Sequence, residues 1–182
     1  MNFVAEPRIP SALRARLARV RIFLCDVDGV LTDGSVFMSG TGELKQFDIQ
    51  DGLGLAILRR SGIPVGWISS RPSAATARRA KDLQIDFLSQ SKDAKVPAVE
   101  RILARAGLTW AEVAYAGDDL VDLAPMKRAG LALAVANAAP EVKRAAHYVT
   151  TRPGGHGAIR ELAELFLKAQ AKWDRVVADY SA

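Results

Sequence analysis

Two aspartates at the end of an apolar segment are the residues of this sequence best suited to chemistry. Asp26 and Asp28 follow the apolar run 22–24 and precede Gly29, where the backbone can turn away. Residues two apart on an extended chain point to the same side, so we expect both carboxylates to face the same way. Because neighbouring carboxylates repel each other, the pair favours a bound cation or a shared proton. The alternative is an aspartate-rich turn that only ends a strand.

Polar residues also follow later apolar segments of the chain. Ser69 comes after a predicted strand at 64–68, and Asp118 comes after one at 113–116. Short apolar segments that alternate with helical segments predict a parallel α/β sheet with helices on both faces. Ligands of such sheets bind beyond the carboxyl ends of the strands. We therefore expect Asp26, Ser69 and Asp118 to converge at one edge of the sheet.

Carboxylates at this edge would suit Mg²⁺ and the transfer of a phosphate group. Carboxylate oxygens are the ligands of a hard cation, and a lysine beside the metal would hold a phosphate. Lys95 opens a predicted helix at 95–106, and we prefer it to Lys92 for this role. Asp26 could attack phosphorus, and Asp28 could protonate the leaving group and later activate a water molecule.

The order and strand positions of these residues resemble the four motifs of the haloacid dehalogenase superfamily of phosphotransferases. The matching residues are 26–30, Ser69, Lys95 and 117–122. Segments 26–34, 47–54 and 154–161 further resemble those phosphatases of the superfamily that act on acidic sugar phosphates. The resemblance implies a Rossmann-like fold and Mg²⁺-dependent hydrolysis of a phosphomonoester through an aspartyl-phosphate intermediate.

The resemblance also implies a role for each matching residue. Asp26 would be the nucleophile and a ligand of Mg²⁺. Asp28 would be the acid and base, and its backbone carbonyl would bind the metal with Asp118 as the third ligand. Ser69 and Lys95 would hold the phosphate. The residues implied to contact the substrate are Asp28, Asp48, Ile49, Gln50, Asp51, Gly52, Arg71, Arg79 and Lys95.

Several features leave the substrate open. Gln50 and Ala56 stand where members of the family often carry cationic side chains. Asp119 and Asp122 are implied to lie just outside the metal ligands. The alternatives to an eight-carbon sugar acid are a nine-carbon keto-acid phosphate, another small phosphomonoester, or a non-catalytic domain that accepts phosphate. Asp28 argues against the last alternative, because such a domain needs no acid or base.

The spacing of the motifs leaves no room for an inserted cap domain. We expect a single domain over residues 1–182, with a core at 20–150, a β-hairpin at 34–47 and a C-terminal loop and helix at 151–182. Between the first two motifs the chain provides only the hairpin and one helix. Without a cap, the site of a monomer would stay open to water. We therefore expect a homo-oligomer in which apolar hairpin residues pack between subunits, and the resemblance implies a tetramer.

Some local structure can also be predicted. Ser11 is expected to cap the first helix, and residues 48–52 are expected to form a loop before a helix at 53–61. A single final helix is expected from 158 to about 173. The resemblance implies that segment 154–157 reaches toward the site of a neighbouring subunit, and its glycines permit the mobility that a gate requires.

Composition and charge argue against several classes of protein, namely nucleic-acid-binding, membrane-spanning and secreted proteins. The chain of 182 residues has 25 basic and 20 acidic residues, a net charge of +5, but the basic residues are spread along helices without interleaved aromatics. This pattern does not favour nucleic-acid binding. No apolar run approaches the length of a membrane span, and residues 1–10 do not resemble a signal peptide. Cys25 is the single cysteine, which is typical of a protein from the reducing cytoplasm.

Overall fold

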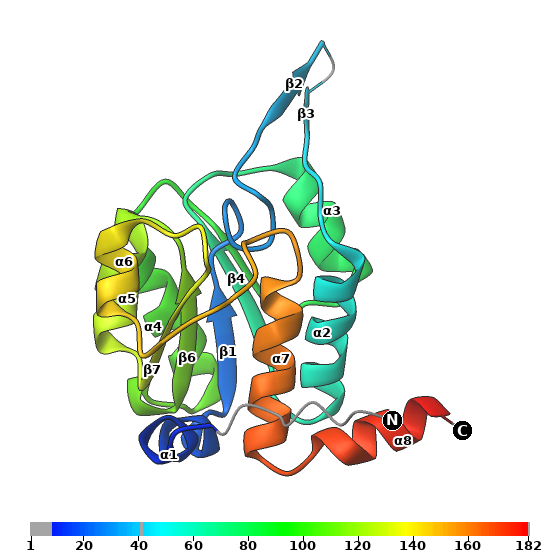
Figure 1. Ribbon diagram of the computed structural model, residues 1–182. Helices are drawn as coiled ribbons and strands as arrows, with labels where there is room; N and C mark the ends of the chain where they lie inside the picture. Colours follow the sequence, from blue (N-terminus) through cyan, green and yellow to red (C-terminus); the bar gives the residue numbers. More distant parts are fainter. Residues whose placement is uncertain (1–8, 41, 182) are drawn as a thin grey trace.

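The computed structural model describes residues 9–40 and 42–181. Within them, a six-stranded parallel sheet runs in the order β5-β4-β1-β6-β7-β8 (Figure 1). The strands of this sheet are β1 (Ile22–Cys25), β4 (Val65–Ser69), β5 (Phe87–Gln90), β6 (Val113–Gly117), β7 (Leu131–Ala134) and β8 (Tyr148–Val149). The predicted Rossmann-like α/β fold is confirmed.

Helices cover both faces of the sheet. The helices are α1 (Ser11–Arg19), α2 (Ile49–Arg60), α3 (Ala74–Asp82), α4 (Lys95–Ala106), α5 (Leu123–Arg128), α6 (Pro140–Ala145), α7 (Ala158–Ala169) and α8 (Trp173–Ser181), with 3₁₀ turns η1 (Trp110–Glu112) and η2 (Leu120–Asp122). Helices α2 and α7 pack side by side over one face, while α4, α5 and α6 lie on the other side of the sheet (Figure 1). Both faces of the central strands are therefore buried, which explains their continuous apolar runs.

The central strands carry the core and fix the position of the site. Every residue of β1, β4 and β6 is buried. Cys25 at the end of β1 is in register with Trp67 of β4 and Ala116 of β6. The residues that follow these strands therefore emerge together at the carboxyl edge of the sheet. Phe166 of α7 packs against Phe23 of β1 in an edge-to-face contact, with ring centroids 5.7 Å apart.

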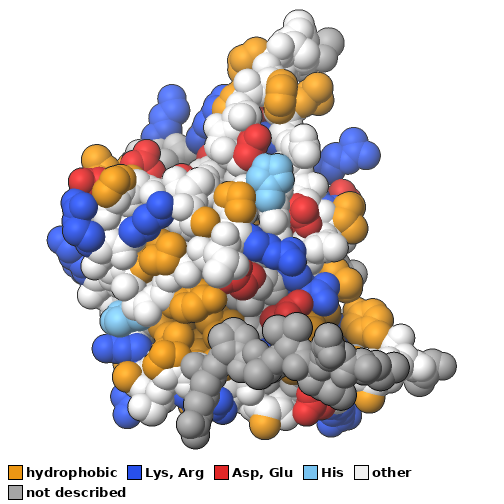
Figure 2. Space-filling model, viewed as in Figure 1, with side chains coloured by type: hydrophobic (Ala, Val, Ile, Leu, Met, Phe, Trp, Pro, Cys, Tyr) orange, Lys and Arg blue, Asp and Glu red, His pale blue; other side chains and the backbone are white. Residues whose placement is uncertain are grey.

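The predicted hairpin is present and projects from the body of the molecule (Figure 1). Its strands are β2 (Phe37–Ser39) and β3 (Gly42–Leu44). Phe37, Met38 and Leu44 are 55%, 75% and 63% exposed, and apolar side chains are visible on the hairpin in Figure 2. Phe47, which the sequence groups with these residues, instead stacks on Trp67 in the body at 6.1 Å.

Two predicted helix ends and one predicted helix cap are wrong. Helix α2 begins at Ile49 rather than at residue 53, because the Asp48 carboxylate accepts a hydrogen bond from the Asp51 amide (3.0 Å) and caps the helix. Ser11 is the first residue of α1 and makes no capping hydrogen bond. The final helix ends at Ala169, and α8 follows as a separate helix after Ala171 turns into the left-handed region (φ 54°).

The domain prediction covers residues 1–182, of which 1–8, 41 and 182 lie outside the described residues. Most of the segment 1–10, in which no signal peptide is expected, also lies outside them. Between β1 and β4, the described part of the chain holds only the hairpin and α2, and no cap domain. None of the described helices has both the length and the hydropathy that a membrane crossing requires.

Burial in this core predicts that the same Leu→Ala substitution changes the free energy of unfolding by very different amounts at two positions. Leu162 of α7 is fully buried, whereas Leu120 is 57% exposed. Leu162→Ala should lower the free energy of unfolding by about 2–5 kcal/mol, because a cavity remains in a packed core. Leu120→Ala should change it by about 0.5 kcal/mol or less. Urea unfolding followed by circular dichroism measures both, and equal losses would contradict this description of the core.

Candidate active site

Three carboxylates meet at the carboxyl edge of the sheet. Asp26 follows β1, and its amide donates a hydrogen bond to the Ala116 carbonyl of β6 (3.0 Å). Asp118 follows β6, and Asp122 closes the η2 turn. Asp26, Asp118 and Asp122 each place a carboxylate oxygen within 4.8 Å of the other two. The structure thus brings Asp26 and Asp118 together, as the strand positions predict.

Lys95 provides the positive charge inside this cluster. Its Nζ atom lies 2.7 Å from an oxygen of Asp26 and 2.7 Å from an oxygen of Asp122. Burial lowers the pKa of Lys95, but the attraction of Asp26 and Asp122 outweighs it, so the pKa is raised and the ammonium group stays charged. Lys92 is exposed, so Lys95 is the lysine of this pair that lies at the cluster.

Both carboxylate oxygens of Asp122 accept hydrogen bonds from other elements. Its Oδ1 atom accepts hydrogen bonds from Lys95 (2.7 Å) and from the Tyr115 hydroxyl (2.9 Å), and its Oδ2 atom accepts one from the Asp118 amide (3.1 Å). It therefore orients Lys95 and the Asp118 backbone. The sequence analysis did not identify Tyr115, although a tyrosine within a buried strand signals that its hydroxyl needs a polar partner.

Asp118 and Asp26 fit a divalent metal ion. The Oδ1 atom of Asp118 is buried and has no hydrogen-bond partner among the described residues. Burial, with repulsion from Asp26 and Asp122, raises the pKa of Asp118 to about 8. Burial also raises the pKa of Asp26 to about 6, against the opposing effect of Lys95. A hard cation with oxygen ligands would remove this repulsion and use the unpaired oxygen.

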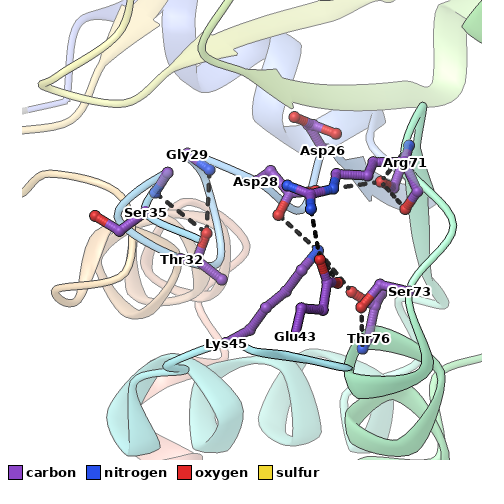
Figure 3. Close-up of polar contacts among 12 residues, drawn as sticks. Asp26, Asp28, Gly29, Thr32, Ser35, Glu43, Lys45, Arg71, Ser73 and Thr76 are labelled. Atoms are coloured by element: carbon purple, nitrogen blue, oxygen red, sulfur yellow. Dashed lines mark hydrogen bonds and ion pairs between the residues drawn. The ribbon is translucent and has the colours of Figure 1, made fainter. Parts of the chain in front are cut away.

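Asp28 belongs to a second cluster, on the side of the hairpin (Figure 3). Its Oδ1 atom lies 2.6 Å from Nζ of Lys45, and its Oδ2 atom lies 3.4 Å from the Ser69 hydroxyl. The Ser69 oxygen also accepts a hydrogen bond from the Arg71 amide (3.0 Å). Ser69 and Asp28 therefore lie together, as expected from their strand ends.

Lys45 is a site residue that the sequence analysis missed. It follows β3, and its side chain is fully buried. Besides Asp28 it contacts the Thr76 hydroxyl (3.2 Å) and a carboxylate oxygen of Glu43 (3.7 Å). In the sequence, a lysine within a hairpin is typical of a solvated position, so only the tertiary structure reveals this contact.

The residues implied to contact a sugar acid are divided between two places. Arg71 pairs with Glu43 (2.6 Å) next to the Asp28 cluster and is partly exposed. Asp48, Asp51, Gly52 and Arg79 line a small cavity beside Phe47. Ile49 and Gln50 are exposed on the first turn of α2. Gln50 contacts the Arg152 guanidinium at 3.4 Å, which places a cation next to this uncharged residue.

The loop 154–157 packs against the turn that follows β1 in the same chain. The Gly154 amide donates a hydrogen bond to the Asn137 side chain (2.7 Å), and the Gly155 amide donates one to the Val30 carbonyl (3.1 Å). A Cβ atom on Gly154 would collide with the carbonyl oxygen of Gly29. These glycines thus permit a close approach of two backbones.

Asp51 anchors the same loop. It is 2% exposed and accepts hydrogen bonds from the amides of Gly157 (3.2 Å) and Arg160 (2.8 Å). Burial raises its pKa to about 6, despite these hydrogen bonds. The carboxylate therefore joins the start of α2 to the start of α7.

The carboxylate cluster predicts a pH dependence of stability in the metal-free protein. Asp118 and Asp26 have raised pKa values of about 8 and about 6 in the folded state, whereas both groups ionise near 3.8 when unfolded. The folded state then holds more protons, so its stability should fall as pH rises from about 4 to about 8. Urea unfolding in EDTA measures this slope, and Mg²⁺ should reduce it.

Two variants separate this effect from other titrations. Asp118→Asn should reduce the slope in EDTA, most of all between about pH 6 and pH 8, because the amide does not ionise while Asp26 still titrates near 6. Asp174→Asn, at an exposed position of α8, should leave it unchanged. An equal slope in the wild type and in Asp118→Asn would contradict the description of this cluster.

Comparison with known proteins identifies the family. A family model described as haloacid dehalogenase-like hydrolase matches residues 56–162. The 3-deoxy-D-manno-octulosonate 8-phosphate phosphatase of Yersinia pestis is 43% identical over 158 residues, which cover 86% of this chain and 84% of that protein.

Solved structures agree with this relationship. The same phosphatase from Moraxella catarrhalis, in complex with magnesium, phosphate and the sugar acid KDO, is 39% identical, with a TM-score of 0.89 over 92% of this chain and 97% of that one. A probable YrbI family phosphatase from Pseudomonas syringae pv. phaseolica 1448a is 41% identical, with a TM-score of 0.92 over 95% and 99% of the two chains. This chain belongs to the haloacid dehalogenase-like hydrolase family.

Proposed function

We propose that this protein is a Mg²⁺-dependent phosphatase that hydrolyses 3-deoxy-D-manno-octulosonate 8-phosphate, the phosphate ester of an eight-carbon sugar acid. The observation that carries the reaction is the buried cluster of Asp26, Asp118 and Lys95, with one oxygen of Asp118 left unpaired. The substrate is supported by the phosphatases named above and by the magnesium, phosphate and KDO bound to the relative from Moraxella catarrhalis.

Each residue of the site has a separate role in the proposed reaction. Asp26 attacks phosphorus, and the charge of Lys95, 2.7 Å from its carboxylate, offsets the repulsion between Asp26 and the phosphate. Mg²⁺, held by Asp26, Asp118 and the backbone carbonyl of Asp28, supplies further positive charge when bound. Ser69 and Lys95 hold the phosphate.

Asp28 moves the protons. It donates a proton to the ester oxygen as the bond from that oxygen to phosphorus breaks, so that the sugar leaves as an alcohol. It then takes a proton from the water that attacks the aspartyl phosphate, which releases inorganic phosphate and restores Asp26.

Recognition of the sugar acid is proposed for the start of α2 and for Arg71 and Arg79, with Arg152 close by. Arg71 lies beside the Asp28 cluster and is exposed enough to meet an anion. Ile49 and Gln50 offer an exposed surface, to which the neighbouring Arg152 adds a cation. The other proposed residues in this region are Asp48, Asp51, Gly52 and Arg79. Asp51 acts there through the loop 154–157, because its oxygens already accept amide hydrogen bonds.

We also propose a homotetramer assembled through the hairpin. Phe37 and Leu44, which are paired across β2 and β3, form an apolar patch on an element that projects from the body, and Met38 is also exposed there (Figure 2). Burial of this patch by a second copy would remove apolar surface from water. The cytoplasm is the proposed compartment, a choice supported by the free thiol of Cys25.

A panel of phosphate esters tests the proposed activity. In the presence of Mg²⁺, the octulosonate ester should give the highest kcat/KM, ahead of a nine-carbon keto-acid phosphate and of simple sugar phosphates. Asp26→Asn should abolish turnover with the fold retained, because the amide fills the same volume but is not a nucleophile. Release of inorganic phosphate measures both, and an active Asn variant would exclude Asp26 as the nucleophile.

Assembly is tested by a charge placed on the hairpin. Light scattering of the wild type should give about four times the 19.6 kDa mass of the chain. Met38→Asp should dissociate the assembly and lower turnover, because a buried unpaired carboxylate is costly. Val177→Asp, at an exposed position of α8, is the control and should change neither. A fully active monomer would refute this assembly.

A further inference from the structure

Lys45 occupies an unusual position for a lysine. Its side chain has no exposed surface, although it follows the exposed hairpin strand β3. Its ammonium group lies among Asp28 Oδ1 (2.6 Å), Thr76 Oγ1 (3.2 Å) and Glu43 Oε1 (3.7 Å), as Figure 3 shows. A buried ammonium group needs compensating partners: here the Thr76 hydroxyl accepts a hydrogen bond, and the Asp28 and Glu43 carboxylates offset the charge as ion pairs.

The partners of Lys45 are themselves held by α3 and by the loop before it. Glu43 pairs with Arg71 (2.6 Å) and accepts a hydrogen bond from Ser73, the residue that caps α3. Thr76 lies in the first turn of α3 and is fully buried. Two cations and two carboxylates therefore alternate from Asp28 to Arg71. The position of the Asp28 side chain depends on this network.

The contacts of Asp28 distinguish its two oxygens. Oδ1 is held by Lys45 at 2.6 Å, whereas Oδ2 has only the long contact of 3.4 Å with the Ser69 hydroxyl. Oδ2 is thus the oxygen that remains available to exchange a proton with a substrate. Without Lys45, the carboxylate could rotate and present either oxygen.

We propose that Lys45 is a positioning residue for the phosphatase reaction, which it serves by holding the acid/base Asp28 through Oδ1 so that Oδ2 faces the leaving group. This inference rests on the proposed function. It also gives the hairpin a second role, because the chain that leaves β3 delivers Lys45 to the site. Lys45 transfers no proton itself, and within the described residues its ammonium group pairs with Asp28 and Glu43, whereas Asp26 pairs with Lys95.

The leaving group of the substrate provides the test. An alkyl phosphate releases an alkoxide that must be protonated as it leaves, so its hydrolysis depends on a well-placed acid. p-Nitrophenyl phosphate releases a stable anion that needs no proton. Comparison of kcat/KM for the two esters therefore isolates the acid step, since kcat/KM reports the barrier relative to free enzyme and free substrate.

Lys45→Met should lower kcat/KM for the octulosonate ester roughly 100-fold and for p-nitrophenyl phosphate by about threefold or less, within the range that acid catalysis contributes. Lys81→Met, at an exposed position of α3, is the matched control and should change neither value. Equal losses for both esters would mean that Lys45 binds the phosphate or only supports the fold, and no loss would mean that it does not position Asp28. Either result overturns the proposal.

Two further measurements keep the test decisive. If Lys45→Met does not fold, as judged by circular dichroism, the double variant K45M/E43Q replaces it, because it also removes one of the two carboxylate charges that Lys45 offsets. The same selective loss is expected. If the wild type does not hydrolyse the octulosonate ester, the proposed substrate fails, and the comparison then uses the alkyl phosphate that the wild type hydrolyses fastest. A wild type without phosphatase activity would refute the proposed function before any variant is compared.

Discussion

Repulsion among buried carboxylates is the constraint on which the rest of this site depends. The parallel sheet places Asp26 and Asp118 at the ends of adjacent strands, and η2 adds Asp122. Lys95 lies between Asp26 and Asp122 and removes part of the repulsion. Burial, together with the remaining repulsion from Asp26 and Asp122, raises the pKa of Asp118 to about 8, and its Oδ1 atom has no hydrogen-bond partner among the described residues. A fold that keeps this charge imbalance is prepared for a cation and an anionic substrate, and it loses stability without them.

Close backbone contacts surround the carboxylate cluster and fix the path of the chain there. The turn at Gly29 has a positive φ of 99° and lies directly under the Asp118 carboxylate, where a Cβ atom would collide with it. On the other side, Gly154 packs against the carbonyl of Gly29. Asn137 and Asp51 fix the loop through its amides. The loop therefore forms one wall of the site. Glycine is needed at position 154 because a Cβ atom there would collide with the neighbouring backbone.

The hairpin combines two roles at its two ends. Its projecting part exposes Phe37 and Met38, while the chain that returns from it brings Lys45 into contact with Asp28. An element that joins an apolar surface to the acid/base of a site can link assembly to catalysis. The link is physical, because movement of the hairpin would displace Lys45 and with it the Asp28 carboxylate.

The sequence by itself determined the sheet, the position of the site and most of its charged groups. Buried parallel strands have continuous apolar runs, and polar residues placed after them must meet at one edge, so Asp26, Ser69 and Asp118 were predictable. Helix α4 was predictable with both its ends, because Lys95 precedes an amphipathic segment and Gly107 adopts the left-handed conformation (φ 65°) that ends it.

Contacts between residues far apart in the sequence were decided only by the tertiary structure. Lys45 and Asp28 meet because the chain that leaves β3 returns past α3, and no local pattern marks a lysine that will be buried. Asp51 was expected in a loop, but its oxygens hold the start of α7, more than a hundred residues later. Local propensity and periodicity describe neighbours along the chain. The partners of a buried charge are set by packing between elements, which local sequence patterns do not encode.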